Sequence, residues 1–225
     1  MAARFTIQTA LFLVALATAL FVPAGTLAWP AAWIFLFELA ASSAVFGVWL
    51  TRHDPALLRE RLAPPFQRGQ PLWDRVFVVA VGLLWSVWIV RMGMDAGRAR
   101  HGDFPLWARA IGALGPAASI YVSYLTMREN SWAVCAVRIQ RERGHRIVTT
   151  GPYRWVRHPM YAGAILFFVG TPLLLGSWTG LAITPLLIAM LAVRAVLEER
   201  ALMRGLAGYS EYAARVRYRL IPFVW

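Results

Sequence analysis

The sequence contains no lysine, and all 23 of its basic residues are arginine. Its single cysteine, Cys135, excludes an internal disulfide, and no cysteine–histidine grouping has the spacing of a zinc site. Charged residues make up only 15% of the 225 residues, where a soluble domain would carry about 25%. These shortages argue against a soluble enzyme, a disulfide scaffold and a structural metal protein.

Long apolar runs dominate the rest of the chain. Apolar residues make up 59% of it, and the mean hydropathy is +0.55. A membrane-crossing helix needs about 20 mostly apolar residues, and the last run is long enough for a hairpin of two helices with a turn near 176–180. We therefore predict an all-α polytopic membrane bundle of about six spans, or five if the last helices merge. The runs are Ile7–Trp29, Ala31–Leu50, Val76–Met94, Leu106–Met127 and Tyr161–Leu197.

The arginines cluster in three polar segments between these runs. Thr51–Asp74 holds four, Arg128–Arg157 holds seven, and the tail after Leu197 holds five. Cytoplasmic loops of membrane proteins carry such an excess of positive charge. We therefore expect both termini and all three segments on the cytoplasmic side of a bacterial inner membrane. The formal charge of +12 then indicates membrane lipids, and not nucleic acid, as the partner.

The chain divides after residue 127. We predict that residues 1–127 form the first four membrane helices, and that residues 128–225 form a cofactor-binding region with a helical hairpin and a tail. Arg128–His158 is the one polar segment long enough to build a site. Function is therefore expected where this segment meets the last hairpin.

Two local features place polar groups at that junction. Pro159 suits the first position of a helix, which puts His158 at the helix mouth, where free backbone N–H groups favour an anion. Arg194 and Glu198 are four residues apart and share one helix face. If the hairpin closes, cationic, anionic and aromatic walls meet beside lipid. A zwitterionic ligand with a flat ring suits such walls; S-adenosyl-L-methionine is one, but other metabolites share these features.

A longer pattern in the C-terminal part is more specific. It consists of GHRIVTTGPYRWVRHPMYAG at 144–163, EER at 198–200, YSEYAARV at 209–216 and LIPF at 220–223. This pattern resembles the isoprenylcysteine carboxyl methyltransferase family, which includes related phospholipid and small-thiol methyltransferases, over about the last 90 residues. The resemblance implies an integral membrane methyltransferase that uses S-adenosyl-L-methionine.

Carried over by position, the resemblance implies a cofactor site with a reacting centre beside it. Arg157 would organise that centre and Arg194 would lie on the substrate side. One residue fewer separates the glutamate pair from Tyr209 than in the family, so the pattern leaves open whether Glu198 or Glu199 contacts the cofactor. The implied cofactor contacts are Gln140, His145, Arg146, Ile147, Val148, Tyr153, His158, Pro159, Met160, Tyr161 and Glu198.

The expected reaction is in-line transfer of a methyl group from the cofactor sulfonium to a lipophilic substrate. A carboxylate or thiolate acceptor needs a cation to hold it, for which Arg194 or Arg157 offers a planar, two-pronged contact. An amine acceptor needs a base, for which Glu199 or His158 is available. An isoprenylcysteine-type carboxylate, a thiol and a lipid amine all remain open as acceptors.

Structural roles compete with these assignments. Arg194 and Glu198 would alternatively form a plain ion pair on one helix. Tyr209 and Tyr212 are expected to be anchors at the membrane interface.

One acidic residue, Glu38, lies in the middle of the second apolar run, where a charge is costly. It is expected to be protonated or paired with Arg109 inside the bundle, and pairing is favoured. For the chain as a whole, the alternatives to a methyltransferase are a membrane reductase that binds a nicotinamide nucleotide and a non-enzymatic membrane protein.

Overall fold

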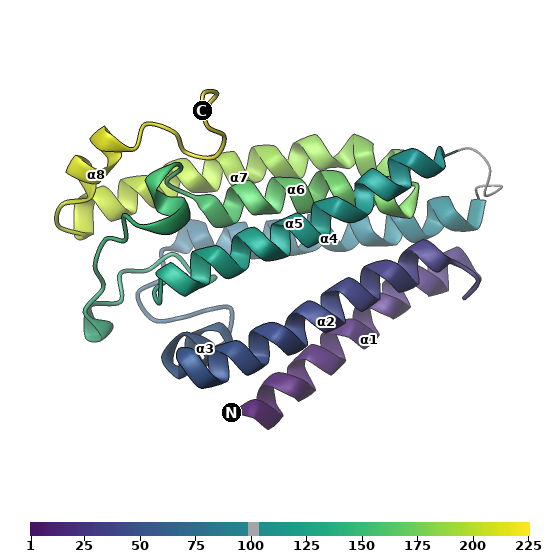
Figure 1. The fold of residues 1–225 in the computed structure, drawn as a ribbon, viewed down its shortest axis with the longest axis horizontal. Coiled ribbons are helices and arrows are strands. Elements are labelled where there is room, and N and C mark those ends of the chain that lie inside the picture. Colours follow the sequence, from purple (N-terminus) through teal and green to yellow (C-terminus); the bar gives the residue numbers. More distant parts are fainter. Residues whose placement is uncertain (99–103) are drawn as a thin grey trace.

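The computed structural model describes residues 1–98 and 104–225, and this part of the chain is helical, with no strand. Within it, six long helices run side by side as a bundle (Figure 1). The predicted all-α bundle is thereby confirmed. In chain order the helices are α1 (Ala2–Ala24), α2 (Pro30–His53), α3 (Pro55–Arg61), α4 (Leu72–Arg98), α5 (Leu106–Glu129), η1 (Arg141–Arg143), η2 (Gly151–Arg154), α6 (Pro159–Leu175), α7 (Trp178–Gly205) and α8 (Tyr209–Arg215).

Five of the described helices, α1, α2, α4, α5 and α7, are long and apolar enough to cross a membrane. The remaining long helix, α6, is apolar but has only 17 residues. It forms a hairpin with α7, as the last apolar run predicts. The turn falls at Gly176, whose φ of 71° lies in the left-handed region that glycine adopts without strain. Ser177 then caps α7 by accepting from the Gly180 N–H at 2.9 Å.

The predicted runs and the observed helices differ at some ends. The first apolar run continues to Trp29, but α1 already ends at Ala24. Gly25 explains the difference, because it adopts a φ of 66° and its N–H donates to the Phe21 carbonyl at 3.0 Å, which closes the helix. The second helix then begins at Pro30, where the missing N–H costs nothing.

Helices α5 and α6 pack backbone against backbone through glycines. A Cβ atom on Gly115 would lie 2.6 Å from the Gly170 Cα, and one on Gly112 would lie 2.2 Å from the Leu174 nitrogen. No larger side chain fits at either place without moving the helices apart. Because α5 leads into the polar segment and α6 begins directly after it, this close packing fixes both borders of that segment.

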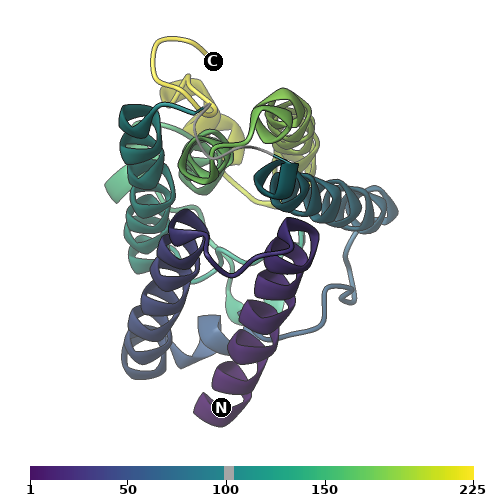
Figure 2. The same ribbon diagram turned by 90° about the vertical axis from the view of Figure 1, so that its right-hand side faces the viewer.

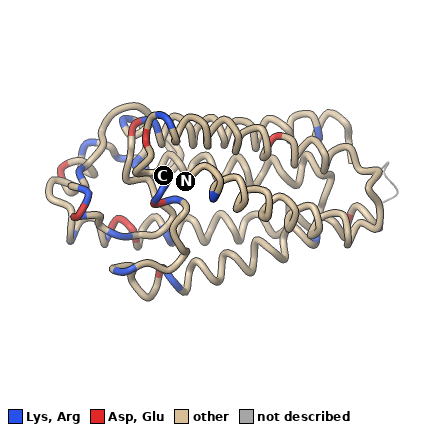
Figure 3. Tube along the Cα trace, turned by 90° about the horizontal axis from the view of Figure 1, so that it is seen from below, with Lys and Arg blue, Asp and Glu red and all other residues tan. Residues whose placement is uncertain are grey.

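Charged residues gather at one end of the bundle, the end that carries α3 and α8 (Figure 3). Helices α1 and α2 lie together below the other four long helices (Figure 2). At the opposite end, Asp95 of α4 accepts hydrogen bonds from the hydroxyls of Ser177 and Thr179, both at 2.7 Å. This carboxylate ties α4 to the turn of the α6–α7 hairpin.

The predicted pairing of Glu38 with Arg109 is wrong. The Glu38 Oε2 and Arg109 Nε atoms are both buried and have no hydrogen-bond partner among the described residues. The Arg109 guanidinium packs against Gly176 at the hairpin turn. Glu38 follows Pro30 by eight residues, which places it about 12 Å into the helix at 1.5 Å per residue. Arg109 follows Leu106, the first residue of α5, by only three residues, so the two side chains lie at different depths along their helices.

Candidate active site

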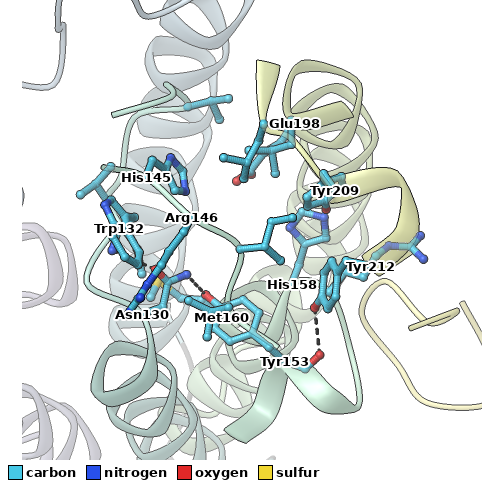
Figure 4. A pocket seen from close by; sticks show the side chains of 18 of the residues that line it. Asn130, Trp132, His145, Arg146, Tyr153, His158, Met160, Glu198, Tyr209 and Tyr212 are labelled. Carbon is cyan, nitrogen blue, oxygen red and sulfur yellow. Dashed lines mark hydrogen bonds between the residues drawn. The ribbon is translucent and has the colours of Figure 1, made fainter. Parts of the chain in front are cut away.

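A pocket lies at the charged end of the bundle, where the polar segment after α5 meets the start of α6, the last turns of α7 and helix α8 (Figure 4). Its empty volume, including the open mouth, is about 840 Å³, a size typical of small-molecule sites. The structure brings most of the predicted site residues to this pocket. Those that line it are His145, Arg146, Ile147, Val148, Tyr153, Arg157, His158, Met160, Tyr161 and Glu198.

A buried carboxylate near the end of α7, that of Glu199, organises one wall from behind. Its side chain is only 2% exposed and it does not line the pocket. One oxygen accepts from Arg157 Nε at 2.6 Å and from His158 Nε2 at 3.1 Å, and the other accepts from Arg219 Nε at 3.0 Å. A buried acid is tolerated when it is paired in this way. The geometry favours Glu199 as the residue that holds Arg157 and His158 in place.

Arg157 also binds the tail that follows α8. Its backbone N–H donates to the Tyr218 carbonyl at 2.9 Å, and the next N–H, that of His158, donates to the Arg219 carbonyl at 2.9 Å. The guanidinium Nη1 donates at 3.3, 2.7 and 3.0 Å to the carbonyls of Ala213, Val216 and Arg217. Arg157 therefore fixes the tail against the mouth of α6.

The tyrosines of α8 complete this wall. The prediction that Tyr209 and Tyr212 anchor the protein at the membrane interface is wrong, because they are only 5% and 3% exposed and both line the pocket. Gly208, with a φ of 82°, turns the chain so that α8 folds back onto η2. The Tyr212 hydroxyl donates to the Tyr153 carbonyl at 2.8 Å. Burial raises the pKa of both α8 phenols, which therefore stay protonated.

Glu198, the neighbour of Glu199, faces the pocket (Figure 4). Its Oε2 accepts from the Tyr161 hydroxyl at 2.6 Å. No arginine or histidine of the described residues lies within ion-pair distance of it. The Tyr161 ring in turn lies parallel to the His158 imidazole, with ring centres 5.3 Å apart. Of the two adjacent glutamates, Glu198 is thus the one placed to meet a ligand.

The opposite wall is a stack built on Trp132. The His145 imidazole lies parallel to the indole with ring centres 5.5 Å apart, and the Arg146 guanidinium carbon lies 5.6 Å from the indole centre. The backbone N–H of Gln140 donates to His145 Nδ1 at 3.4 Å. Burial, and then the charge of nearby Arg143, lower the pKa of His145. Its imidazole is therefore neutral at pH 7.

Gln140 supports this wall from behind and does not line the pocket. It is fully buried, and its Nε2 donates to the Trp132 carbonyl at 3.0 Å. Tyr153 forms the floor of the pocket, and Asn130 supports it, because the Asn130 Nδ2 donates to the Tyr153 hydroxyl at 2.6 Å (Figure 4). Asn130 and Trp132 were not among the predicted site residues. The signal available for them was an amide and an indole directly after the fourth apolar run.

Arg194 lies next to Tyr161 but does not itself line the pocket. Its guanidinium carbon is 5.8 Å from the Tyr161 ring centre, and its Nη2 donates to the Cys135 carbonyl. The alternative in which Arg194 pairs with Glu198 is wrong, because its acid partner is Asp74 of α4, with an Nη2–Oδ1 distance of 3.0 Å.

Asp74 is a further residue that the sequence did not reveal. Its side chain is fully buried, and it also accepts from the Val137 N–H at 2.9 Å. It therefore joins α4, the polar segment and α7. The remaining predicted site residue, Pro159, occupies the first position of α6 as expected and is buried outside the pocket lining.

The C-terminal part of the chain is similar to known methyltransferases. Residues 107–208 match the family model described as phospholipid methyltransferase. Over 90 residues the chain is 36% identical to protein-S-isoprenylcysteine O-methyltransferase B of Arabidopsis thaliana, a match that covers 39% of this chain and 45% of that protein.

Two further relatives have similar names. The chain is 32% identical over 90 residues to a probable protein-S-isoprenylcysteine O-methyltransferase of Oryza sativa subsp. indica, covering 39% of this chain and 47% of the relative. It is 30% identical over 82 residues to protein-S-isoprenylcysteine O-methyltransferase of Schizosaccharomyces pombe, covering 36% and 35%. The chain thus spans less than half the length of the curated relatives it matches.

Proposed function

We propose that the protein is an integral membrane methyltransferase. The premise is that the C-terminal part of this chain is related to the isoprenylcysteine carboxyl methyltransferase family. We further propose that it uses S-adenosyl-L-methionine, methylates a lipophilic acceptor and has its active site in residues 128–225. The observation that carries this proposal is Glu198, a carboxylate without a cationic partner among the described residues, inside a pocket with aromatic and basic walls.

The residues present fit S-adenosyl-L-methionine, which supplies a methyl group already activated on a sulfonium. The Glu198 carboxylate would receive the ammonium group. Arg146, which forms no ion pair with an acid of the described chain, would receive the carboxylate. The Tyr161 ring offers the electron-rich face that attracts a sulfonium. The apolar side chains of Ile147 and Val148 would pack on the adenine.

The task of the protein is then to align donor and acceptor and to exclude water. Glu199 and Arg157 hold the tail against the start of α6. Arg194, kept in place by Asp74, would hold a carboxylate or thiolate acceptor next to Tyr161. For an amine acceptor, His158 is the better placed base. Its Nε2 donates to Glu199, so Nδ1 carries the lone pair. Glu199 is less available as a base, because Arg157, His158 and Arg219 already donate to it.

The membrane setting supports a lipophilic acceptor. Five helices have the length and composition of membrane spans, and the pocket lies at the end of the bundle where arginines gather (Figure 3). Arginine-rich ends of membrane proteins face the cytoplasm, so we place the active site on the cytoplasmic side of a bacterial inner membrane. The names of the relatives and of the family model favour an isoprenylcysteine carboxylate or a phospholipid amine as acceptor.

The first experiment is calorimetric binding of S-adenosyl-L-methionine to the purified protein in detergent. We expect micromolar binding that is lost in Glu198→Ala and Tyr153→Ala, because the first removes the pocket carboxylate and the second removes the pocket floor. Glu211→Ala, which changes an exposed acid of α8 outside the pocket lining, is the matched control and should bind as the wild type does.

Two results would overturn the proposal. One is a folded wild-type protein that does not bind S-adenosyl-L-methionine, in which case nicotinamide nucleotides are the next ligands to test. The other is binding that Glu198→Ala and Tyr153→Ala leave unchanged, which would place the cofactor elsewhere. Transfer of a labelled methyl group to S-farnesylated N-acetylcysteine or to phosphatidylethanolamine then distinguishes a carboxylate acceptor from an amine acceptor.

A further inference from the structure

The last residues of the chain expose apolar side chains. Phe223 is 87% exposed, Val224 is 74% exposed and Ile221 is 43% exposed. Leu220, directly before them, is 3% exposed and faces the protein. The C-terminal loop projects from the outer surface of the bundle, beside the end that carries α8 (Figure 2). These apolar side chains are not buried by the rest of the chain, so we expect another surface to shield them from water.

The position of α6 fixes how deep this loop lies in the membrane. Arg157 and His158 donate their N–H groups to the carbonyls of Tyr218 and Arg219, both at 2.9 Å, and His158 is the residue that directly precedes α6. The 17 residues of α6 extend about 25 Å at 1.5 Å per residue. The hydrocarbon core of a bilayer is about 30 Å thick. A helix this short that runs alongside longer spans begins at the membrane boundary, not beyond it.

The loop is held in one conformation at that level. The N–H groups of Arg219, Leu220 and Ile221 all donate to the Trp225 carbonyl, at 2.9, 2.9 and 3.1 Å. The Arg219 guanidinium carbon lies 5.0 Å from the Trp225 ring centre, while Arg219 Nε donates to buried Glu199. The exposed side chains therefore sit on a fixed turn and do not belong to a free end.

The chemistry of the loop matches the boundary between lipid headgroups and acyl chains. Tryptophan is enriched at that boundary, because its ring is apolar and its N–H is polar. The exposed Arg215 and Arg217 shortly precede the apolar residues in the chain, where they can meet lipid phosphates. At the depth set by α6 the loop is surrounded by lipid, which a soluble protein partner does not enter.

We propose that residues 218–225 form an interfacial membrane anchor, in which Phe223, Val224 and Trp225 enter the headgroup–acyl boundary of the bilayer. The anchor covers the apolar side chains and holds the tail against the pocket wall. This inference depends on the position of the loop and not on the reaction that the pocket performs.

The test measures the depth of the loop in lipid. The full chain is prepared with Cys135→Ser, which removes the exposed native thiol and leaves the carbonyl that Arg194 binds. Phe223→Cys is then labelled with an environment-sensitive nitrobenzoxadiazole dye, and the protein is placed in nanodiscs of phosphatidylcholine and phosphatidylglycerol. Val224→Cys gives a second labelled site. Ser210→Cys, at an exposed position of α8, is the matched control.

We expect labels at 223 and 224 to emit at shorter wavelength than the label at 210. They should be quenched by a nitroxide on a shallow acyl carbon, and iodide in the buffer should quench them severalfold less than it quenches the control. Equal iodide quenching at all three sites would overturn the proposal. Protection from iodide without nitroxide quenching would also overturn it, because protein would then cover the loop.

Discussion

The two ends of the bundle satisfy the carboxylates that join their helices differently. At the hairpin turn, Asp95 accepts from two hydroxyls and one N–H, those of Ser177 and Thr179, and no described cation lies within ion-pair distance. At the charged end, Glu199 and Asp74 are bound by arginines from distant parts of the chain. At the hairpin turn, uncharged donors join only α4 and the start of α7. Arginines make a network that joins helices, polar segment and tail around a pocket.

The largest effect is expected when this network loses its central acid. Glu199→Ala leaves the buried Arg157 and the partly exposed Arg219 without their shared partner. Removing one member of a buried ion pair costs about 3–5 kcal/mol, and the tail should detach from the mouth of α6. Thermal unfolding in detergent and limited proteolysis after α8 measure the two consequences. An unfolding midpoint like that of the wild type would show that the network is not a stabilising element.

The second prediction concerns Arg194, the arginine bound to Asp74 at the charged end. Because Arg194 lies outside the pocket lining, Arg194→Ala should lower the rate of methyl transfer by about 10²-fold or more, the typical loss for one positioned donor, while S-adenosyl-L-methionine still binds. Rate and dissociation constant are measured on the same preparation, with Arg194→Lys as a variant that keeps the charge. Equal loss of binding and transfer would remove Arg194 from the substrate side.

A smaller effect is expected at the opposite end. Asp95→Ala removes a carboxylate that accepts only from uncharged donors, and leaving such donors unsatisfied costs about 1–3 kcal/mol. The unfolding midpoint should fall less than in Glu199→Ala, and the affinity for S-adenosyl-L-methionine should not change. A loss of affinity in Asp95→Ala would mean that the two ends are coupled through α7 and do not act independently.

The smallest effect is a pH dependence at the Trp132 stack. The pKa of His145 lies below its ordinary value of 6.5, so the folded protein holds this proton more weakly than the unfolded chain does. The resulting stabilisation is complete above that ordinary value and is lost as the pH falls through the lowered pKa. Unfolding midpoints between about pH 7 and pH 5 should decline less steeply in His145→Gln than in the wild type. Parallel curves would contradict this prediction.

The sequence predicted the helices well, because apolar runs and helix-ending residues are local signals. Pro159 at the first position of α6 and the hairpin turn at Gly176 follow directly from residue type. The pairing of Glu38 could not be predicted in the same way. It depends on how far along the bundle axis each side chain lies, and the sequence alone does not specify how the helices are aligned along that axis.

The pocket was predictable where the family motif defines it and unpredictable where distant segments meet. Adjacent residues of a helix point about 100° apart, so the pair Glu198–Glu199 has one member in the pocket and one behind it, and the rotation of α7 decides which. The partner of Arg194 is Asp74, 120 residues earlier. No local pattern connects those two residues, because the contact exists only once α4 and α7 are packed.

The binding of the tail by Arg157 also has a consequence for biosynthesis. Glu199 can meet Arg157 as soon as the α6–α7 hairpin has inserted into the membrane, but Arg219 follows Glu199 by 20 residues. Arg157 also binds the carbonyls of residues 213, 216 and 217, and these residues too are synthesised after the hairpin. The wall formed by α8 and the tail is therefore the last part of the site to be assembled, so an unfinished chain already in the bilayer has an incomplete pocket.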